Sequence, residues 1–422
     1  MSKVAILTAF AEFPPGYSLT GIVKDQVRML TEHGHEVSLF VAEHFKKEDE
    51  AAFGPEVRIV KRIPFTHQKD YKTKKDLTPE HREIAERTAA VLVEELQDTP
   101  IVFTHDFVFT GWFYPFGLGC QIASPQLPNT RWLHWIHSVP SVRSDWWEIK
   151  DYGSHHKLVY PNRIDAIKVA EQYRGFPDDV RVIPHIKDMR SWFDYDDETC
   201  KFIREFPAVM QAHVVQIYPS SVDRLKAKRL KEVIKIFAHL KRRGLSVCLV
   251  VANQWATGKQ QKEDILKYKK IAAEEDLIVG QEVIFSSDWQ NGKYDVGLPK
   301  RIVRELFQLS NLFIFPTREE TFGLVLPEAS LAGGVLCVLN KSLKMMLEVS
   351  GFTSIYFDFG SFDQEHHIEN EDAYFKDIAW LIAARLKHNE SILTKTHMRR
   401  TFNYDALYNK VYGPIMAESQ IW

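Results

Sequence analysis

Two glutamates are the first residues of this chain whose type and spacing suggest chemistry. Glu320 and Glu328 are separated by seven residues within T-R-E-E-T-F-G-L-V-L-P-E-A-S-L-A-G-G, residues 317–334. Carboxylates accept hydrogen bonds, so such a pair could hold the hydroxyl groups of a sugar or a ribose. The alternative is that Glu320 is a solvated loop acid and that Glu328 interacts with a helix dipole. The spacing alone does not separate the two interpretations.

The residues around the glutamates favour a ligand site. The apolar run N-L-F-I-F predicts a strand that ends at Pro316, and a helix is expected to begin near Phe322. Glu328 should then lie about two helical turns further on. Gly323 allows a ligand to approach the backbone closely. Because the first N–H groups of a helix lack partners, we expect residues 321–323 to bind an anion, especially a phosphate.

The whole 317–334 string closely resembles the donor-binding motif of the retaining glycosyltransferases of family four, in the superfamily of glycogen synthase and phosphatidylinositol mannosyltransferase. Three other segments resemble this family in the same order: A-E-F-P-P-G-Y-S-L-T-G (11–21), V-I-P-H-I-K-D (182–188) and T-F-N-Y-D-A-L-Y-N-K-V-Y (401–412). The chain departs from the family at Thr20-Gly21, where Gly-Gly is usual, and at His185-Ile186, where Asn-Gly is usual. The resemblance implies an α/β protein of GT-B architecture, with two Rossmann-like domains that face each other across a cleft.

The resemblance also implies which residues hold a nucleotide-sugar donor. Lys228 matches the family's phosphate-binding lysine, while Pro219-Ser220 stand where its arginine is expected, so Arg224 is the candidate for that role. Glu320 would hold the sugar and Glu328 the ribose. The predicted donor-binding residues are Arg224, Lys228, Glu320, Thr321, Phe322, Gly323, Leu324 and Glu328.

Candidate residues in the first half of the chain follow predicted strands. His137 corresponds to a family histidine that contacts the donor sugar, although a strand-end histidine can also be purely structural. His105 and Asp106 are expected on the acceptor side. Ser18, Thr20 and Gly21 in the loop after the first strand complete the cleft residues. His134 can equally be a core residue or a site residue. H-H-K (155–157) is expected at the surface, and H-G-H-E-V (33–37) in a structural role.

The implied reaction is sugar transfer with retention of configuration. His137, Glu320 and Lys228 are the predicted catalytic residues. Since no in-line carboxylate nucleophile stands out, front-face attack is expected, with the leaving diphosphate stabilised by cations and a helix end. No D-x-D pair is evident, so no metal and no cofactor are expected beyond the nucleotide sugar, with UDP-sugar favoured over GDP-sugar.

Alternating strand and helix patterns must position these residues, and they predict parallel α/β sheets. The expected domains are 1–190, which binds the acceptor, 191–395, which binds the donor, and 396–422, a closing helix that crosses back to the first. The expected strands are 4–10, 36–41, 57–60, 101–104, 131–136 and 157–160, followed by 213–218, 246–251, 282–285, 311–315 and 334–339.

Composition sets limits on the partners. The 422 residues are 45% hydrophobic and 26% charged, with a net charge of -2, so no general attraction to nucleic acid or membrane is expected. Four scattered cysteines without a C-x-x-C pair indicate reduced thiols in a cytoplasmic protein. No run approaches the ~18 apolar residues of a membrane span.

The sequence does not identify the acceptor. A glycan or small polar molecule is favoured. A hydroxylated base flipped out of DNA is an alternative, because Trp112, Trp132, Trp135, Trp146 and Trp147 are interleaved with basic residues and a second basic run covers 67–75. A lipid-linked acceptor, a nucleotide-sugar epimerase and a non-catalytic sugar-binding protein of the same fold are further alternatives. A dinucleotide oxidoreductase is disfavoured, since no G-x-G-x-x-G follows the first strand. The sequence does not predict an oligomeric state.

Overall fold

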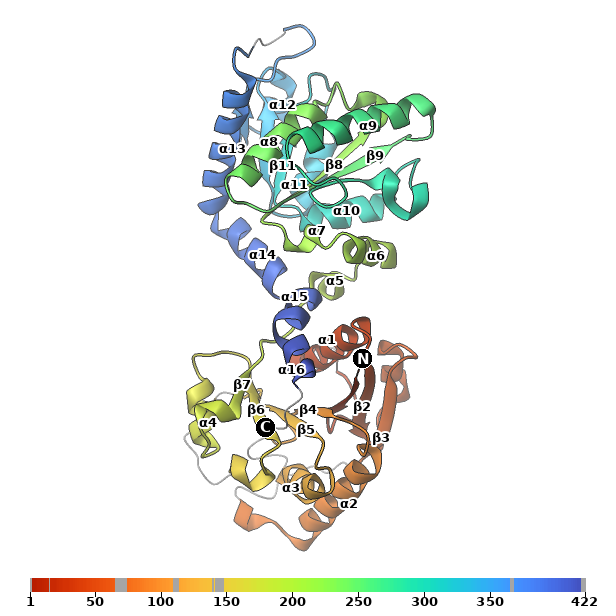
Figure 1. Ribbon diagram of the computed structural model, residues 1–422, viewed down its shortest axis with the longest axis vertical. Coiled ribbons are helices and arrows are strands. Elements are labelled where there is room, and N and C mark those ends of the chain that lie inside the picture. Colours follow the sequence, from red (N-terminus) through yellow and green to blue (C-terminus); the bar gives the residue numbers. More distant parts are fainter. Residues whose placement is uncertain are drawn as a thin grey trace. The chain divides into compact units, whose positions relative to one another are not determined.

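The chain forms two compact units in the computed structural model. One unit contains Met1–Asp188 and Phe402–Trp422, and the other contains Met189–Thr401. The structure describes residues 2–14, 16–64, 74–108, 114–138, 140, 148–364 and 368–418. Each unit is built on parallel sheets flanked by helices (Figure 1), which confirms the predicted α/β class.

The first unit contains a seven-stranded parallel sheet in the order β3-β2-β1-β4-β5-β6-β7. This is a doubly wound order, in which the strand sequence reverses between β1 and β4 and ligands bind beyond the carboxyl ends of the strands. The strands are β1 (Lys3–Leu7), β2 (Glu36–Ala42), β3 (Arg58–Ile63), β4 (Ile101–His105), β5 (Arg131–Trp135), β6 (His156–Tyr160) and β7 (Val180–Val182). The short β7 was not among the expected strands.

Helices cover both faces of this sheet (Figure 1). Helices α2 and α3 pack on one face, where Leu92 and Phe116 join the core, and α1 packs on the other through Val23, Val27 and Leu30. The helices of the unit are α1 (Ser18–Glu32), α2 (Pro79–Glu95), α3 (Tyr114–Ala123), α4 (Ala166–Gln172), α15 (Tyr404–Leu407) and α16 (Gly413–Ala417), with a π-helix at Tyr408–Tyr412. The short 3-10 turns are Lys47–Ala52, Lys74–Asp76, Ser124–Gln126, Ile149–Tyr152 and Pro177–Asp179.

The C-terminal residues are anchored on the α1 face of the first unit. The Tyr404 hydroxyl donates to Asp25 Oδ1 over 2.8 Å, and Tyr412 is buried beside α1. The Tyr408 ring stacks on His33 with 3.8 Å between ring centroids, and its hydroxyl lies 2.7 Å from His35 Nε2. The H-G-H-E-V turn therefore has the structural role expected of it, which is to hold the end of the chain.

The second unit contains two three-stranded parallel sheets, in the orders β10-β9-β8 and β11-β12-β13. The strands are β8 (Val214–Ser221), β9 (Val247–Gln254), β10 (Val283–Phe285), β11 (Leu312–Phe315), β12 (Leu336–Asn340) and β13 (Ile355–Phe357). The three-residue β13 was also not expected from the sequence.

Side chains join the two sheets of the second unit where β8 meets β11. The buried Gln216 amide donates to the Ile314 carbonyl and accepts from the Ile314 N–H, both over 2.9 Å. Asn311 Oδ1 accepts from the Val215 N–H over 3.0 Å. This pairing gives the combined order β10-β9-β8-β11-β12-β13, so the loops that follow β8 and β11 lie side by side at the carboxyl edge.

The helices of the second unit flank these sheets around one continuous apolar core. They are α5 (Met189–Trp192), α6 (Asp197–Glu205), α7 (Ala208–Gln211), α8 (Leu230–Arg242), α9 (Lys259–Glu274), α10 (Lys300–Leu309), α11 (Val325–Ala332), α12 (Lys344–Val349), α13 (Glu371–Lys387) and α14 (Glu390–Thr401), with 3-10 turns at Val222–Arg224 and Ser286–Gly292. Within the described residues, no helix is long and apolar enough to cross a membrane.

Candidate functional site

The 316–324 loop, between β11 and α11, carries Glu320 and the first part of the predicted donor-binding motif. Helix α11 begins at Val325, three residues later than the expected start at Phe322. The reason is Gly323, whose φ of +76° is incompatible with a right-handed helix. The N–H groups of residues 321–323 therefore belong to the loop rather than to a helix end, and Glu328 lies one turn into α11 instead of two.

A lysine and a glutamate from two neighbouring loops meet at this edge of the sheet. Lys228, just before α8, forms an ion pair with Glu320 of the 316–324 loop. Both side chains are largely buried, with 12% and 20% of their surface exposed, and Lys228 Nζ lies 4.8 Å from the centroid of the Phe315 ring. The structure thus joins two of the predicted catalytic residues, which are 92 residues apart in the chain.

A second ion pair lies between the same two loops. Arg224 contacts Glu319 over 3.1 Å, with about half of each side chain exposed. The Arg318 N–H donates to the Ala227 carbonyl over 3.0 Å, so the backbones of the two loops are also bonded. Glu319 was not predicted, although its position directly before Glu320 was a signal that the sequence offered.

The Glu320 carboxylate is charged at neutral pH. Burial alone would raise its pKa, but the hydrogen bond and the positive charge of Lys228 outweigh burial and lower it. The Thr321 N–H also donates to Glu320 Oε1 over 3.2 Å. The loop therefore holds a partly buried anion beside a partly buried cation.

Gly323 is tightly enclosed, while its neighbours are open. A Cβ atom at this position would lie 3.2 Å from Met346 Sδ and 3.3 Å from Glu320 Cγ. Phe322 and Leu324 on either side are exposed. The glycine is therefore required both by its φ and by the space between Glu320 and α12.

Glu328 is bound by a residue that the sequence analysis did not single out. It forms an ion pair with Lys300, the first residue of α10, and about a third of its side chain is exposed. Both residues lie in the first turn of a helix, Lys300 in α10 and Glu328 in α11. Lys300 offers no motif of its own, so only the packing of α10 against α11 reveals it.

In the first unit, the candidate residues after β4 and β5 form a chain of hydrogen bonds. His137 Nε2 lies 2.9 Å from His105 Nδ1, and His105 Nε2 lies 2.7 Å from Gln26 Oε1. Because the Gln26 amide nitrogen faces the Tyr412 hydroxyl, its oxygen must accept from His105 Nε2–H. His105 Nδ1 then accepts from His137 Nε2–H, which leaves a lone pair on His137 Nδ1.

That His137 Nδ1 lone pair is buried without a partner among the described residues. Burial, followed by the neighbouring His105 and His185, lowers the pKa of His137, and burial lowers the pKa of His105 to about 3. Both rings are therefore neutral. The His185 ring stacks on His137 with 5.2 Å between centroids and was missed as a site residue, because it stands in the hinge-like V-I-P-H segment.

Asp106 adds a carboxyl group to this cluster. Burial raises the pKa of Asp106 to about 7, against a hydrogen bond from the His137 backbone that lowers it. Its φ is +54°, and within the described residues its Oδ1 atom is buried without a partner. A strained residue with an unsatisfied polar atom is typical of a functional site.

The other predicted cleft residues of this unit lie in the first turn of α1 rather than in a loop. Ser18 is the first residue of the helix, and the Thr20 hydroxyl donates to the Tyr17 carbonyl over 2.6 Å. Gly21 lies inside the helix, where an added Cβ would meet no atom within 4 Å.

Several aromatic and histidine residues are in the core. Trp132 and Trp135 are fully buried and offer no stacking surface. His134 is a core residue. The surface prediction for H-H-K is wrong at His156, which is buried between His134 Nε2 at 2.7 Å and Ser124 Oγ at 2.7 Å. Trp112, Trp146, Trp147, Arg143 and 67–73 lie outside the described residues.

No cluster of three or more His, Cys, Asp or Glu side chains that could hold a metal ion occurs in the part of the chain that the structure describes.

Comparisons with known proteins find similar solved structures but no family. No family model and no curated protein matches the chain. The similar structures include a glycosyltransferase from Rickettsia africae ESF-5 (14% identity, 99% of both chains covered, TM-score 0.39), Anabaena HepE in complex with UDP and glucose (14%, 99% of this chain and 100% of that chain, 0.35), and WaaG, a glycosyltransferase involved in lipopolysaccharide biosynthesis (12%, 99% and 100%, 0.31). Because these TM-scores are below 0.5, function must be inferred from the residues of this chain.

Proposed function

We propose that this protein is a retaining glycosyltransferase of GT-B type, which moves a sugar from a nucleotide sugar to an acceptor hydroxyl. The observation that carries the proposal is the meeting of Lys228 and Arg224 with Glu320 and Glu319 at the carboxyl edge of the second unit's sheet. This is the edge where open α/β sheets bind ligands. Two cations there suit a diphosphate, and two carboxylates suit the hydroxyl groups of a sugar.

The Lys228–Glu320 ion pair gives a physical route to donor binding. The diphosphate would take the place of Glu320 as the partner of Lys228, because its two phosphates carry one negative charge each and offer several oxygens that accept charge-assisted hydrogen bonds. Glu320 would then be free to accept hydrogen bonds from the sugar. Glu328, at the start of α11, would hold the ribose, with a UDP-sugar favoured over a GDP-sugar.

The proposed chemistry is front-face displacement. The bond between the anomeric carbon and the diphosphate oxygen breaks, a bond to the acceptor oxygen forms on the same face, and the acceptor proton passes to the leaving diphosphate. Lys228 and Arg224 would stabilise the charge that develops on the diphosphate. His137 would contact the sugar, as the family resemblance implies.

Acceptor binding would fall to the first unit. His137 Nδ1 and Asp106 Oδ1 are buried polar atoms without partners among the described residues, and buried polar groups are normally satisfied. A hydroxyl of the donor sugar could donate to His137 Nδ1, while Asp106, with a pKa near 7, could accept from or donate to an acceptor hydroxyl. A glycan or another small polyhydroxyl molecule fits such an acceptor site.

A donor screen tests the proposal. The protein would be incubated with UDP-, GDP- and ADP-sugars, each with simple glycans, with hydroxymethylated DNA and without acceptor, and released nucleotide would be measured. Turnover that requires an acceptor is expected. Absence of turnover with every donor, together with an unchanged melting temperature in the presence of each nucleotide, would refute the transferase proposal.

Three variants test the assigned roles. Lys228→Ala should weaken UDP binding about 10- to 100-fold, because a charge-assisted hydrogen bond contributes about 1.5–3 kcal/mol, whereas the exposed neighbour Lys226→Ala should not. Glu320→Ala should abolish transfer while UDP still binds. If Glu328→Ala left UDP affinity unchanged, the ribose assignment would be wrong.

A further inference from the structure

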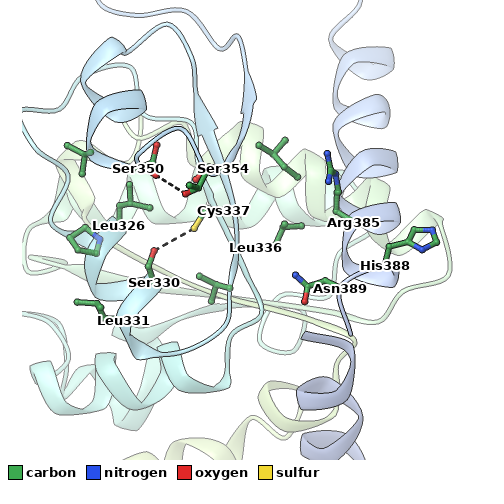
Figure 2. Close-up of a pocket in the computed structure, with 15 residues that line it drawn as sticks. Leu326, Ser330, Leu331, Leu336, Cys337, Ser350, Ser354, Arg385, His388 and Asn389 are labelled. Atoms are coloured by element: carbon green, nitrogen blue, oxygen red, sulfur yellow. Dashed lines mark hydrogen bonds between the residues drawn. The ribbon is translucent and has the colours of Figure 1, made fainter. Parts of the chain in front are cut away.

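A cavity of about 730 Å³ lies in the second unit, away from the 316–324 loop (Figure 2). Its walls come from α11, the end of α12 and the loop after it, and the junction of α13 with α14. Leu336 and Ile355, the first residues of β12 and β13, form part of its lining. The cavity therefore lies at the amino edge of the sheet, whereas the 316–324 loop follows the carboxyl end of β11.

The charge of the cavity lining favours an anion. None of the fifteen lining residues is Asp or Glu, although the chain as a whole has 56 acidic against 54 basic residues. The lining includes one permanent cation, Arg385 on α13, and its side chain has no ion pair within the described residues. His388 also belongs to the lining, but Figure 2 shows its ring pointing away from the strands.

Small polar groups belong to the same lining. Figure 2 shows Ser330 of α11 and Ser354 on one side of the cavity, and Asn389 on the other side together with Arg385. The Ser330 hydroxyl lies 3.8 Å from Cys337 Sγ, which is a long contact. Burial raises the pKa of Cys337, so its sulfur is a neutral part of the wall.

The volume of the cavity and the apolar side chains in its lining suit a small organic molecule better than an inorganic ion. The volume lies in the range of about 300–1,000 Å³ that holds small organic ligands. Apolar side chains, among them Leu326, Leu336 and Val349, form most of the remaining lining, together with Ser350 and Thr353. We infer that this cavity binds a small organic phosphate, a phosphorylated sugar or nucleoside, with the phosphate on Arg385 and the hydroxyl groups of the ligand on Ser330, Ser354 and Asn389.

Helix α11 connects the cavity with the proposed donor site. With about 100° between successive residues of a helix, Leu326 and Ser330 occupy one face of α11 and Glu328 the opposite face. The first face lines the cavity and the second carries the Lys300 ion pair. A bound phosphate would therefore act on the helix that carries Glu328. This part of the inference rests on the proposed function, and it predicts that the cavity ligand changes UDP affinity.

Calorimetric titration with glucose 6-phosphate, AMP and inorganic phosphate tests the site. Saturable binding of at least one of the two organic phosphates is expected, and binding of glucose 6-phosphate alone or of AMP alone identifies the ligand as a sugar or a nucleoside phosphate. Arg385→Ala should weaken this binding at least tenfold, while Lys387→Ala, on the same helix but outside this lining, should not. The AMP titration uses Lys228→Ala protein, so that the proposed donor site does not contribute.

Three results would overturn the site. The first is the absence of saturable binding by both organic phosphates, and the second is binding that Arg385→Ala leaves unchanged. The third is inorganic phosphate that binds as tightly as the organic phosphates, because the apolar side chains of the lining would then contribute nothing. Since the Arg385 side chain is exposed, its replacement should leave the fold intact, which circular dichroism would check.

A separate titration with UDP tests the coupling. UDP affinity should change at least threefold when the cavity ligand is saturating, and Arg385→Ala should remove the change. If UDP affinity is the same with and without the cavity ligand, the coupling is refuted, but the proposal that the cavity binds a phosphate ligand is not. Failure of UDP to bind at all would refute the proposed donor site, while the glucose 6-phosphate titration would still decide on the cavity.

Discussion

Mild acid should unfold the first unit, because this unit buries histidines that are neutral in the folded state. Burial lowers the pKa of His105 and of His134 to about 3, and it is the main cause that lowers the pKa of His137, His156 and His185. In an unfolded chain, a histidine has a pKa of about 6.5. Between pH 3 and 6.5 the unfolded chain therefore binds protons that the native unit does not, and the free energy of unfolding falls as the pH falls.

The size of this effect follows from the pKa differences. One pKa unit corresponds to about 1.4 kcal/mol, so at pH 5 His105 and His134 each remove about 2 kcal/mol of stability. Asp106 acts in the opposite direction. Its pKa of about 7 in the folded state means that the native unit binds a proton the unfolded chain lacks, which returns about 2 kcal/mol between pH 7 and pH 5.

The remaining histidines decide the balance. His137, His156 and His185 all lower stability in acid, so the net loss at pH 5 should reach several kcal/mol. Domains are typically stable by only about 5–15 kcal/mol. We therefore expect the first unit to open at a pH near 5, before carboxylates with ordinary pKa values are protonated.

Thermal melts from pH 8 to pH 5, combined with hydrogen exchange of peptides from each unit, would measure this effect. The melting temperature should fall, with faster exchange in β4, β5 and β6 than in β8 and β9. Asp106→Asn should stabilise the unit by about 4 kcal/mol at pH 8, where the buried carboxylate is charged, and by much less at pH 5. A constant melting temperature, or earlier exchange in the second unit, would refute the reasoning.

Three further predictions concern the second unit. Gly323→Ala should destabilise the 316–324 loop by about 1–2 kcal/mol and weaken UDP binding, because φ is +76° and Met346 Sδ lies 3.2 Å from the new Cβ; equal UDP affinity in both proteins would contradict this. Gln216→Leu should lower the free energy of unfolding by about 2–5 kcal/mol in urea titrations, since it leaves the buried N–H and carbonyl of Ile314 unpaired; a loss below 1 kcal/mol would show that this junction is not needed. Arg399→Met should cost at least about 3 kcal/mol in the same assay, because three backbone carbonyls lose their buried donor, whereas Arg400→Met, at a half-buried neighbour that donates to the Gln211 carbonyl, should cost only about 1 kcal/mol.

The sequence alone determined the fold class and most of the elements. Each of the eleven expected strands overlaps an observed one, because buried parallel strands leave short apolar runs that local pattern reveals. The two short strands β7 and β13 were missed, since three residues carry too little pattern. The start of α11 was placed too early, because the left-handed conformation of Gly323 was not considered as a reason for the helix to start later.

The sequence also identified Lys228 and Glu320 as individual site residues, but only the tertiary structure shows that they contact each other. Their loops meet because β8 and β11 lie side by side, joined by Gln216. The same holds in the first unit, where β4, β5 and the C-terminal segment bring His105, His137, Gln26 and Tyr412 into one chain of hydrogen bonds. Local periodicity fixes which residues form strands and helices. Contacts between residues tens to hundreds of positions apart depend instead on the order in which strands pair, and that order is set by packing across the whole sheet.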